Sequence, residues 1–78
     1  MSMVEPISES DPDFVGSLAK GLSVIRVFGK DSPKMSISDV ARSTGITRAG
    51  ARRLLLTLHA LGYLHTDGRR FSLAPRTL

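Results

Sequence analysis

The pattern of apolar and polar positions along the chain predicts three helices followed by a short hairpin. The first helix spans residues 16–29, where apolar residues recur at intervals of four, three and three, as on one stripe of an amphipathic helix. That stripe consists of Leu18, Leu22, Ile25 and Phe28. We expect it to pack against the rest of the domain.

The ends and the width of this first helix carry further predictions. Ser17 is a suitable N-cap, because its hydroxyl can accept a hydrogen bond from an early backbone N–H, and Gly29 is a suitable stop. Val24 and Val27 lie beside the stripe and make the apolar face wider than a single contact requires. We therefore expect part of this face to meet a second protomer. The polar residues 30–34, which include a proline, predict a surface turn.

The second helix is predicted to begin at a capping box. Residues 36–39 match the signal in which Ser36 accepts from an early backbone N–H and Asp39 reaches back to the cap. Ile37, Val40 and Ala41 form its apolar face. Gly45 follows at the point where a left-handed residue can end the helix, so a tight turn is expected there.

The third helix has a leucine face and a basic face. Thr47 is the expected N-cap. At 100° per residue, the face expected in the core consists of Ala51, Leu54, Leu55, Leu58 and Leu61. The other side carries Ala49, Arg52, Arg53 and Leu56, with Arg48 at its edge. Ala49 and Gly50 are small, which favours close approach of this helix to a groove.

Residues 62–75 read as a two-stranded wing. Gly62 ends the third helix, residues 63–66 and 71–73 have strand character, and Asp67-Gly68 is a strong signal for the turn between them. Pro75 stands where another helix can begin. The predicted fold class is therefore mainly α with a small two-stranded antiparallel hairpin, which is a winged helix-turn-helix.

Composition and charge narrow the function. The chain has 78 residues, a hydrophobic fraction of 41% and no cysteine, so we expect one small domain without disulfides. Residues 1–13 hold four acidic and no basic residues, whereas the remainder holds eleven Lys and Arg against three Asp, a balance of +8. That balance favours a polyanionic partner. We expect residues 1–15 to form a disordered acidic tail and residues 16–78 to form the folded domain; the alternative for the tail is that its negative charge competes with DNA for the basic surface.

Other classes of function find no support in the residues. The chain has neither an apolar run of membrane-spanning length nor a signal peptide, so a cytoplasmic location is expected. His59 and His65 have no Cys or carboxylate neighbours at ligand spacing, so we expect no metal and no cofactor. The sequence contains no Ser/His/Asp set and no glycine-rich phosphate loop, so no residues in it indicate an enzyme.

Three segments together resemble the N-terminal DNA-binding domain of the IclR family of bacterial transcriptional regulators. They are SLAKGLSVIRVF at residues 17–28, SISDVARSTGITRAGARRLLLTLHALGYL at 36–64, and DGRRFSLAPR at 67–76. Within the family, the chain looks most like the subgroup that controls breakdown of aromatic acids such as protocatechuate and 4-hydroxybenzoate. Many IclR-type sequences carry Pro-Lys-Ser-Thr-Ala-Tyr-Arg where residues 47–53 stand here, so the operator sequence does not carry over.

The resemblance implies a winged helix-turn-helix that binds double-stranded DNA as a homodimer in a bacterial, nucleoid-associated regulator. A linker helix and a domain that binds a small-molecule effector normally follow. That second domain is absent from these residues, so we expect the chain to be a fragment of a longer protein.

The start of the third helix carries the residues expected to read bases. An arginine in the major groove can donate two parallel hydrogen bonds to guanine. Base contacts are expected from Thr47, Arg48, Ala49 and Arg52. Contacts with the DNA backbone or minor groove are expected from Lys34, Ser36, Arg42, Arg53, Arg69 and Arg70. The alternative for the helix arginines is that they contact phosphates or are simply solvated. The alternative for Arg69 and Arg70 is a solvated hairpin tip, and the alternative for the whole domain is a module that binds another protein.

Overall fold

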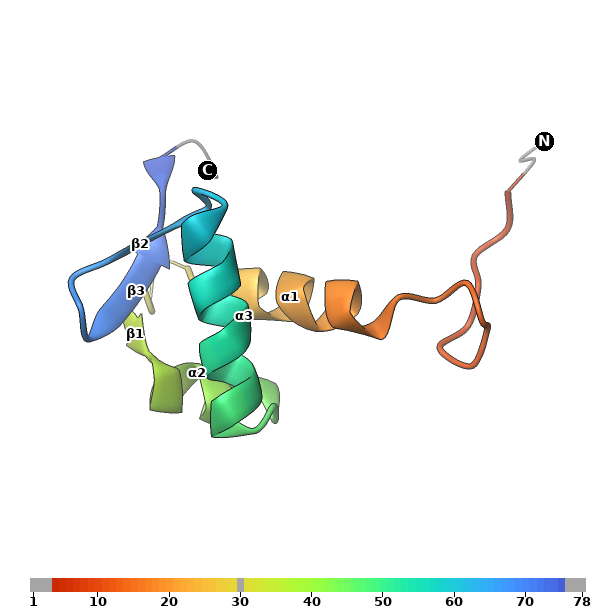
Figure 1. The fold of residues 1–78 in the computed structure, drawn as a ribbon, viewed down its shortest axis with the longest axis horizontal. Helices are drawn as coiled ribbons and strands as arrows, with labels where there is room; N and C mark the ends of the chain where they lie inside the picture. The colour runs from red at the N-terminus through yellow and green to blue at the C-terminus, as the bar shows by residue number, and fades with distance from the viewer. Residues whose placement is uncertain (1–3, 30, 76–78) are drawn as a thin grey trace.

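Helices and short strands surround a central helix in the computed structural model, which describes residues 4–29 and 31–75 (Figure 1). The elements are α1 (Gly16–Arg26), β1 (Met35–Ser36), α2 (Ile37–Thr44), α3 (Arg48–Ala60), β2 (Leu64–Thr66) and β3 (Arg70–Leu73). In Figure 1, α3 stands between the sheet on one side and the N-terminal segment on the other, with α1 running from beside α3 toward that segment and α2 at the lower end of α3. The winged helix-turn-helix predicted from the sequence is confirmed.

The sheet has one strand more than predicted. Its order is β1-β3-β2, and both pairs are antiparallel. The predicted hairpin is present, with Leu64 opposite Leu73. β1 adds to its outer edge because Met35, which is buried, pairs with Phe71. A strand of two residues is too short to show the alternation by which strands are found in a sequence.

The helix α1 begins at Gly16 as predicted, but its predicted N-cap and its predicted C-terminal end are wrong. Val15 is the N-cap, and its side chain makes no capping hydrogen bond, so Ser17 does not cap the helix. The helix ends at Arg26 rather than continuing to Gly29. Its last turn tightens, because the N–H of Val27 bonds to the carbonyl of Val24 at 3.3 Å, three residues back.

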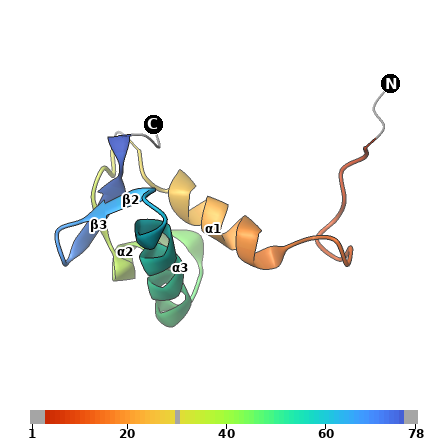
Figure 2. The ribbon, with the colours of Figure 1, turned by 45° about the horizontal axis from the view of Figure 1, so that its top comes forward.

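The core lies where α1, α2 and α3 meet the sheet. The buried cluster consists of Val24, Phe28, Met35, Val40, Ala51, Leu55, Leu64 and Phe71. Two predictions are wrong here. In the stripe of α1, Leu18 is 60% and Leu22 is 44% exposed, and on the leucine face of α3, Leu61 is 65% exposed. The first half of α1 extends beyond α3, so its stripe remains uncovered (Figure 2). Leu61 is the C-cap, one residue past α3 and at the margin of the core-facing stripe.

The ends of α2 and α3 follow the sequence signals. The backbone N–H of Ser36 donates to Oδ2 of Asp39 at 3.1 Å, and the N–H of Asp39 donates to Oγ of Ser36 at 3.1 Å, which completes the capping box. Gly45 ends α2 with φ 75°, and Gly62 follows α3 with φ 87°. Both glycines adopt the left-handed conformation that turns the chain away from the helix axis.

Residues 4–15 form neither a helix nor a strand and project away from the domain (Figures 1 and 2). They contain two turns, in which the N–H of Asp11 bonds to the carbonyl of Ser8 and the N–H of Phe14 bonds to the carbonyl of Asp11. The disorder of residues 1–15 stays a prediction. The helix expected after Pro75 falls on residues 76–78, outside the described part.

Candidate nucleic-acid interface

The four residues expected to read bases lie exposed at the start of α3. Thr47 is the N-cap, and its hydroxyl oxygen accepts from the N–H of Gly50 at 3.1 Å. This bond fixes the direction in which the first turn begins. Arg48, Ala49 and Arg52 then face solvent, while Ala51 and Leu55 point into the core. The face opposite the core is therefore basic and has little bulk near its N-terminal end.

Arg48 is tied to α2 by a residue that the sequence interpretation missed. Its Nε donates to Oγ of Ser38 at 3.2 Å. The two residues are ten positions apart, and no spacing rule pairs them; the only signal is a polar residue in the first turn of α2. Among the described residues the terminal nitrogens of Arg48 make no hydrogen bond, so they remain free to bind another molecule.

Arg52 is exposed, and no hydrogen bond or ion pair within the described part of the chain engages its guanidinium. One helical turn separates it from Arg48. Its donors therefore remain free for a bidentate contact, whereas Arg48 is oriented from Nε by Ser38.

Gly50 serves the turn between α2 and α3. A Cβ at this position would lie 3.0 Å from Cγ2 of Ile46 and 3.0 Å from Oγ1 of Thr47, tighter than ordinary van der Waals contact. The close neighbours are thus within the protein. This packing accounts for the glycine without the approach to a groove that the sequence suggested.

The tip of the wing is held by two side chains. Oδ1 of Asp67 accepts from the backbone N–H of Arg69 at 2.9 Å and of Arg70 at 2.8 Å. These two bonds lower the pKa of the Asp67 carboxyl, and the bond from Arg70 has the larger effect. The hydroxyl of Thr66 donates to the carbonyl of Arg70 at 2.9 Å. The bonds fix the backbone of the turn while the arginine side chains stay exposed. Thr66 was missed, although Thr and Asp before a glycine are residues that bond to turn backbones.

The wing tip lies beside the start of α2. Ser36 and Asp39 line one hollow together with Asp67, Arg69 and Arg70. Ser38 in the same helix bonds to Arg48, so α2 contacts the start of α3 as well as the wing. The wing tip and the start of α3 are therefore both neighbours of the start of α2.

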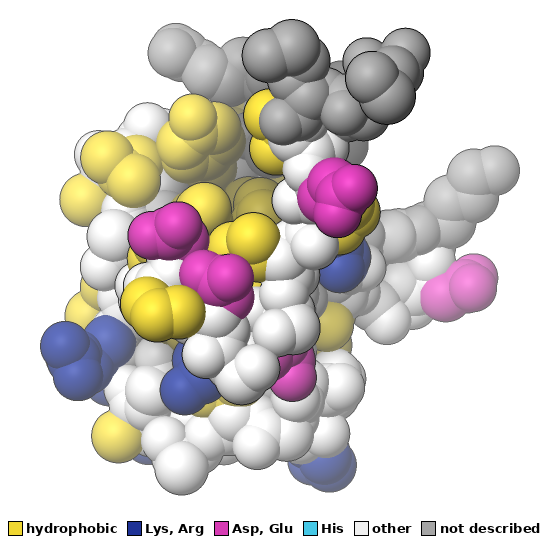
Figure 3. All heavy atoms as spheres, turned by 90° about the vertical axis from the view of Figure 1, so that its right-hand side faces the viewer, with side chains coloured by type: hydrophobic (Ala, Val, Ile, Leu, Met, Phe, Trp, Pro, Cys, Tyr) yellow, Lys and Arg dark blue, Asp and Glu magenta, His cyan; other side chains and the backbone are white. Residues whose placement is uncertain are grey.

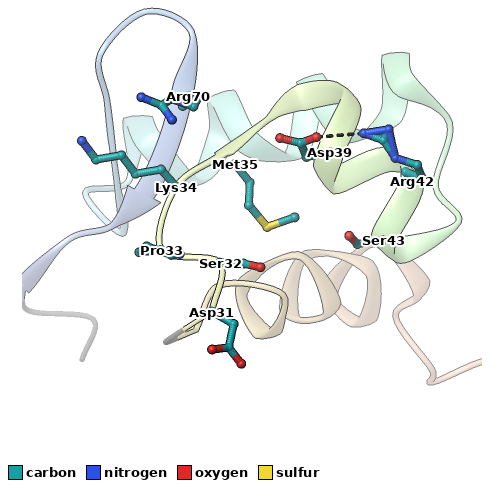
Figure 4. A pocket seen from close by; sticks show the side chains of 9 residues that line it. All are labelled: Asp31, Ser32, Pro33, Lys34, Met35, Asp39, Arg42, Ser43 and Arg70. Carbon is teal, nitrogen blue, oxygen red and sulfur yellow. Dashed lines mark hydrogen bonds and ion pairs between the residues drawn. The ribbon is translucent and has the colours of Figure 1, made fainter.

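Arg42 and Lys34 lie on either side of an acidic residue. Nη2 of Arg42 pairs with Oδ1 of Asp39 at 2.8 Å. This hydrogen bond, followed by the bonds from Ser36, lowers the pKa of Asp39 to about 2. In Figure 4 the side chains of Lys34 and Arg70 extend to the same side, away from the Asp39–Arg42 pair. Lys34 and Arg70 are therefore the freer cations here, and phosphate contact by Arg42 stays a prediction.

Arg53 faces another part of the surface. It is exposed and lines a groove between α3 and α1, away from the wing. Leu56, one turn further along the outward face of α3, is 40% exposed.

Residues 4–29 and 31–75 contain neither a metal-binding cluster nor a membrane-spanning helix. No group of three His, Cys, Asp or Glu side chains is placed to hold a metal ion. No helix there combines the length and apolar character needed to cross a membrane. Nδ1 of His59 lies 2.8 Å from the carbonyl oxygen of Leu64, a contact that joins α3 to β2.

Comparisons with known proteins agree with this geometry. The model of the IclR helix-turn-helix domain matches residues 17–68. The chain is 48% identical over 66 residues to the Pca operon regulatory protein of Acinetobacter baylyi, covering 85% of this chain and 24% of the relative. It is 47% identical over 66 residues to the p-hydroxybenzoate hydroxylase transcriptional activator of the same species, covering 85% of this chain and 24% of that relative.

Solved structures show the same fold. An IclR family transcriptional regulator from Brucella abortus aligns with a TM-score of 0.82 and 32% identity, over 94% of this chain and 29% of the other. A transcriptional-regulator structure from Rhodococcus sp. RHA1 aligns with a TM-score of 0.80 and 57% identity, over 83% of this chain and 26% of the other. The chain spans about a quarter of the length of the curated relatives it matches.

Proposed function

This chain belongs to the IclR helix-turn-helix family, and on that premise we propose that it reads specific double-stranded DNA sequences as the DNA-binding domain of a transcriptional regulator. The observation that carries the proposal is the start of α3. There the exposed Arg52 has no partner among the described residues, and the small Ala49 lies one turn before it. A cationic fork beside a small side chain suits entry into a major groove.

In this proposal the residues of α3 divide the work of recognition. Arg52 donates two hydrogen bonds to guanine O6 and N7, while Arg48 uses the terminal nitrogens that Ser38 leaves free. Thr47 caps the helix and contacts the edge of the groove. Ala49 allows the helix axis to approach the bases.

The wing and the start of α2 supply the contacts that do not depend on sequence. Arg69 and Arg70 are presented by a turn whose backbone is fixed by Asp67, so they reach the DNA backbone or the minor groove with little loss of backbone freedom. Lys34 and Ser36 add phosphate contacts beside them. These contacts position α3 in its groove.

The regulatory role follows from the relatives. Two of them are named for the Pca operon and for p-hydroxybenzoate hydroxylase, and p-hydroxybenzoate is an aromatic acid. We assign this chain to the control of aromatic-acid catabolism genes in the bacterial cytoplasm. We further assign effector recognition to the part of such regulators that this chain does not cover.

We propose that the chain binds DNA as a homodimer. Val15, Leu18 and Leu22 form an apolar stripe on α1 with exposed fractions of 58%, 60% and 44%. A second protomer covers this stripe in the bound form and places two α3 helices about one DNA turn, near 34 Å, apart.

Selection of bound sequences from random duplex DNA tests the proposal. We expect a motif with two half-sites separated by about one helical turn. The Arg52→Ala variant should retain binding to random DNA but recover a motif that has lost preference at one position of each half-site, a discrimination worth about 1–3 kcal/mol per base. If salt-sensitive binding yields no motif, the chain is a nonspecific polyanion binder and the proposal fails. Equal loss of affinity for all sequences would move Arg52 to the phosphate contacts.

A further inference from the structure

An open groove of about 810 Å³ lies outside the surface that joins the wing to α3. It runs between the first half of α1 and the start of α3. Its walls include Ser17 and Lys20 from α1 and Thr47, Arg53 and Thr57 from α3. These residues are exposed and polar, and they come from two elements that pack against each other.

The groove is positively charged, with one acidic residue at its margin. Lys20 and Arg53 are the cations along its described walls, and neither takes part in an ion pair within residues 4–29 and 31–75. Glu9, from the projecting N-terminal segment, lines the same groove. Figure 3 looks at the molecule from the side of that segment and shows acidic side chains interspersed with Lys and Arg side chains on this face.

The groove is continuous with the surface proposed to read bases. Thr47 lines it and is also the N-cap of α3. Arg53 is the next residue after Arg52, so the two guanidinium groups leave α3 on neighbouring sides. A duplex that receives Arg52 in its major groove therefore brings one of its two phosphate strands toward Arg53 and Lys20.

We propose that Lys20 and Arg53 clamp the DNA backbone on the side of α3 opposite the wing, so that the DNA-binding surface extends onto α1. This inference rests on the proposed function and adds Lys20 to the interface. The polyanion that fits is the duplex itself, because the groove opens beside the helix that reads bases and presents two unpaired cations to it. The wing and the groove then hold the two strands on the two sides of α3.

Glu9 weakens this clamp in the free protein. Glu9 lines the same groove as the two cations, so its negative charge lowers the positive potential that a phosphate meets there. The acidic segment therefore competes with DNA at one defined place, through one residue.

The test compares charge removals on α1. Lys20→Gln is paired with Arg26→Gln, which removes the same charge from the last turn of the same helix, outside the groove. Affinity of the 78-residue chain for its selected duplex and for random duplex is measured across salt concentrations, with thermal unfolding as a check on folding. We expect Lys20→Gln to reduce the salt slope by about 0.9 per bound chain and to weaken binding to both duplexes by about eightfold at 0.1 M salt. Arg26→Gln should leave the slope unchanged.

A second pair of variants tests the acidic residue. Glu9→Gln should strengthen binding to both duplexes, whereas Glu5→Gln, in the same segment but outside the groove, should not. Equal effects within either pair would mean that only net charge matters and would overturn the inference. No change for Lys20→Gln would also overturn it.

Failure of this inference and failure of the proposed function are distinguishable. If the unmodified chain selects no motif, the proposed function has failed. If it selects a motif that depends on Arg52 but Lys20→Gln binds like the unmodified chain, only the extension onto α1 has failed.

Discussion

Truncation of Leu55 tests how the two faces of α3 are assigned. Leu55 is fully buried in the cluster where the helices meet the sheet. Leu55→Ala removes three carbon atoms, a transfer cost of about 2.4 kcal/mol at about 0.8 kcal/mol for each, and the cavity left behind raises the expected loss to about 2–5 kcal/mol. A chain of 78 residues has a total free energy of unfolding of about 4–12 kcal/mol. The substitution therefore removes a large share of the stability.

Leu56→Ala is the matched control, because it removes the same atoms from the next residue of the same helix. Leu56 is 40% exposed on the side that faces away from the core. Urea unfolding followed by circular dichroism should show a large drop in midpoint for Leu55→Ala and little change for Leu56→Ala. The melting temperature of Leu55→Ala should fall by at least about 10 °C. Similar losses in the two variants would refute the assignment of the faces.

Two further predictions concern the wing and the capping box. Replacing Arg69 and Arg70 by Ala should weaken binding to all duplexes and lower the salt slope by up to about 2 per chain; an unchanged slope would show that the wing does not touch DNA. The pKa of Asp39 is lowered from 3.8 to about 2, so its charged form stabilises the fold above about pH 4, and that contribution is lost as the pH falls through about 2. Asp39→Asn should therefore have a lower urea midpoint than the unmodified chain at neutral pH, and the difference in midpoint should narrow toward pH 2. A difference in midpoint that does not depend on pH would contradict the role of the charge.

Local signals located the helix-turn-helix because each is carried by neighbouring residues. The capping box of Ser36 and Asp39, the left-handed Gly45 and the cap at Thr47 were all found in the sequence and are present in the structure. Each involves a hydrogen bond or a backbone angle set within three or four residues. Such features depend little on the rest of the fold.

The errors occur where burial depends on distant elements. The stripe of α1 has helical spacing, yet Leu18 is exposed because no described element covers its side of the first half of α1. The strand at Met35 exists only because Phe71, which follows it by 36 positions, offers it a partner. Periodicity does not show how much of an apolar face a neighbouring element covers. It also does not show a strand pairing that involves only two residues.

The candidate interface divides in the same way. Exposure and charge at Arg48, Ala49 and Arg52 were predicted from the helical period alone, and the structure shows these residues exposed at the start of α3. Their contacts with DNA stay predictions. The sequence did not contain the bond from Arg48 to Ser38, the hollow shared by the wing tip and α2, or the groove that includes Lys20.

The sequence by itself determined the three helices, the hairpin and the basic side of α3, because helical period, caps and turn residues act over a few neighbouring positions. Only the tertiary structure decided which apolar residues are covered and which charged residues share a surface. Those properties depend on where helices end and cross in space. The same separation explains why the residues proposed to read DNA were visible in the chain, whereas the residue proposed to extend the interface, Lys20, became visible only when α1 was placed against α3.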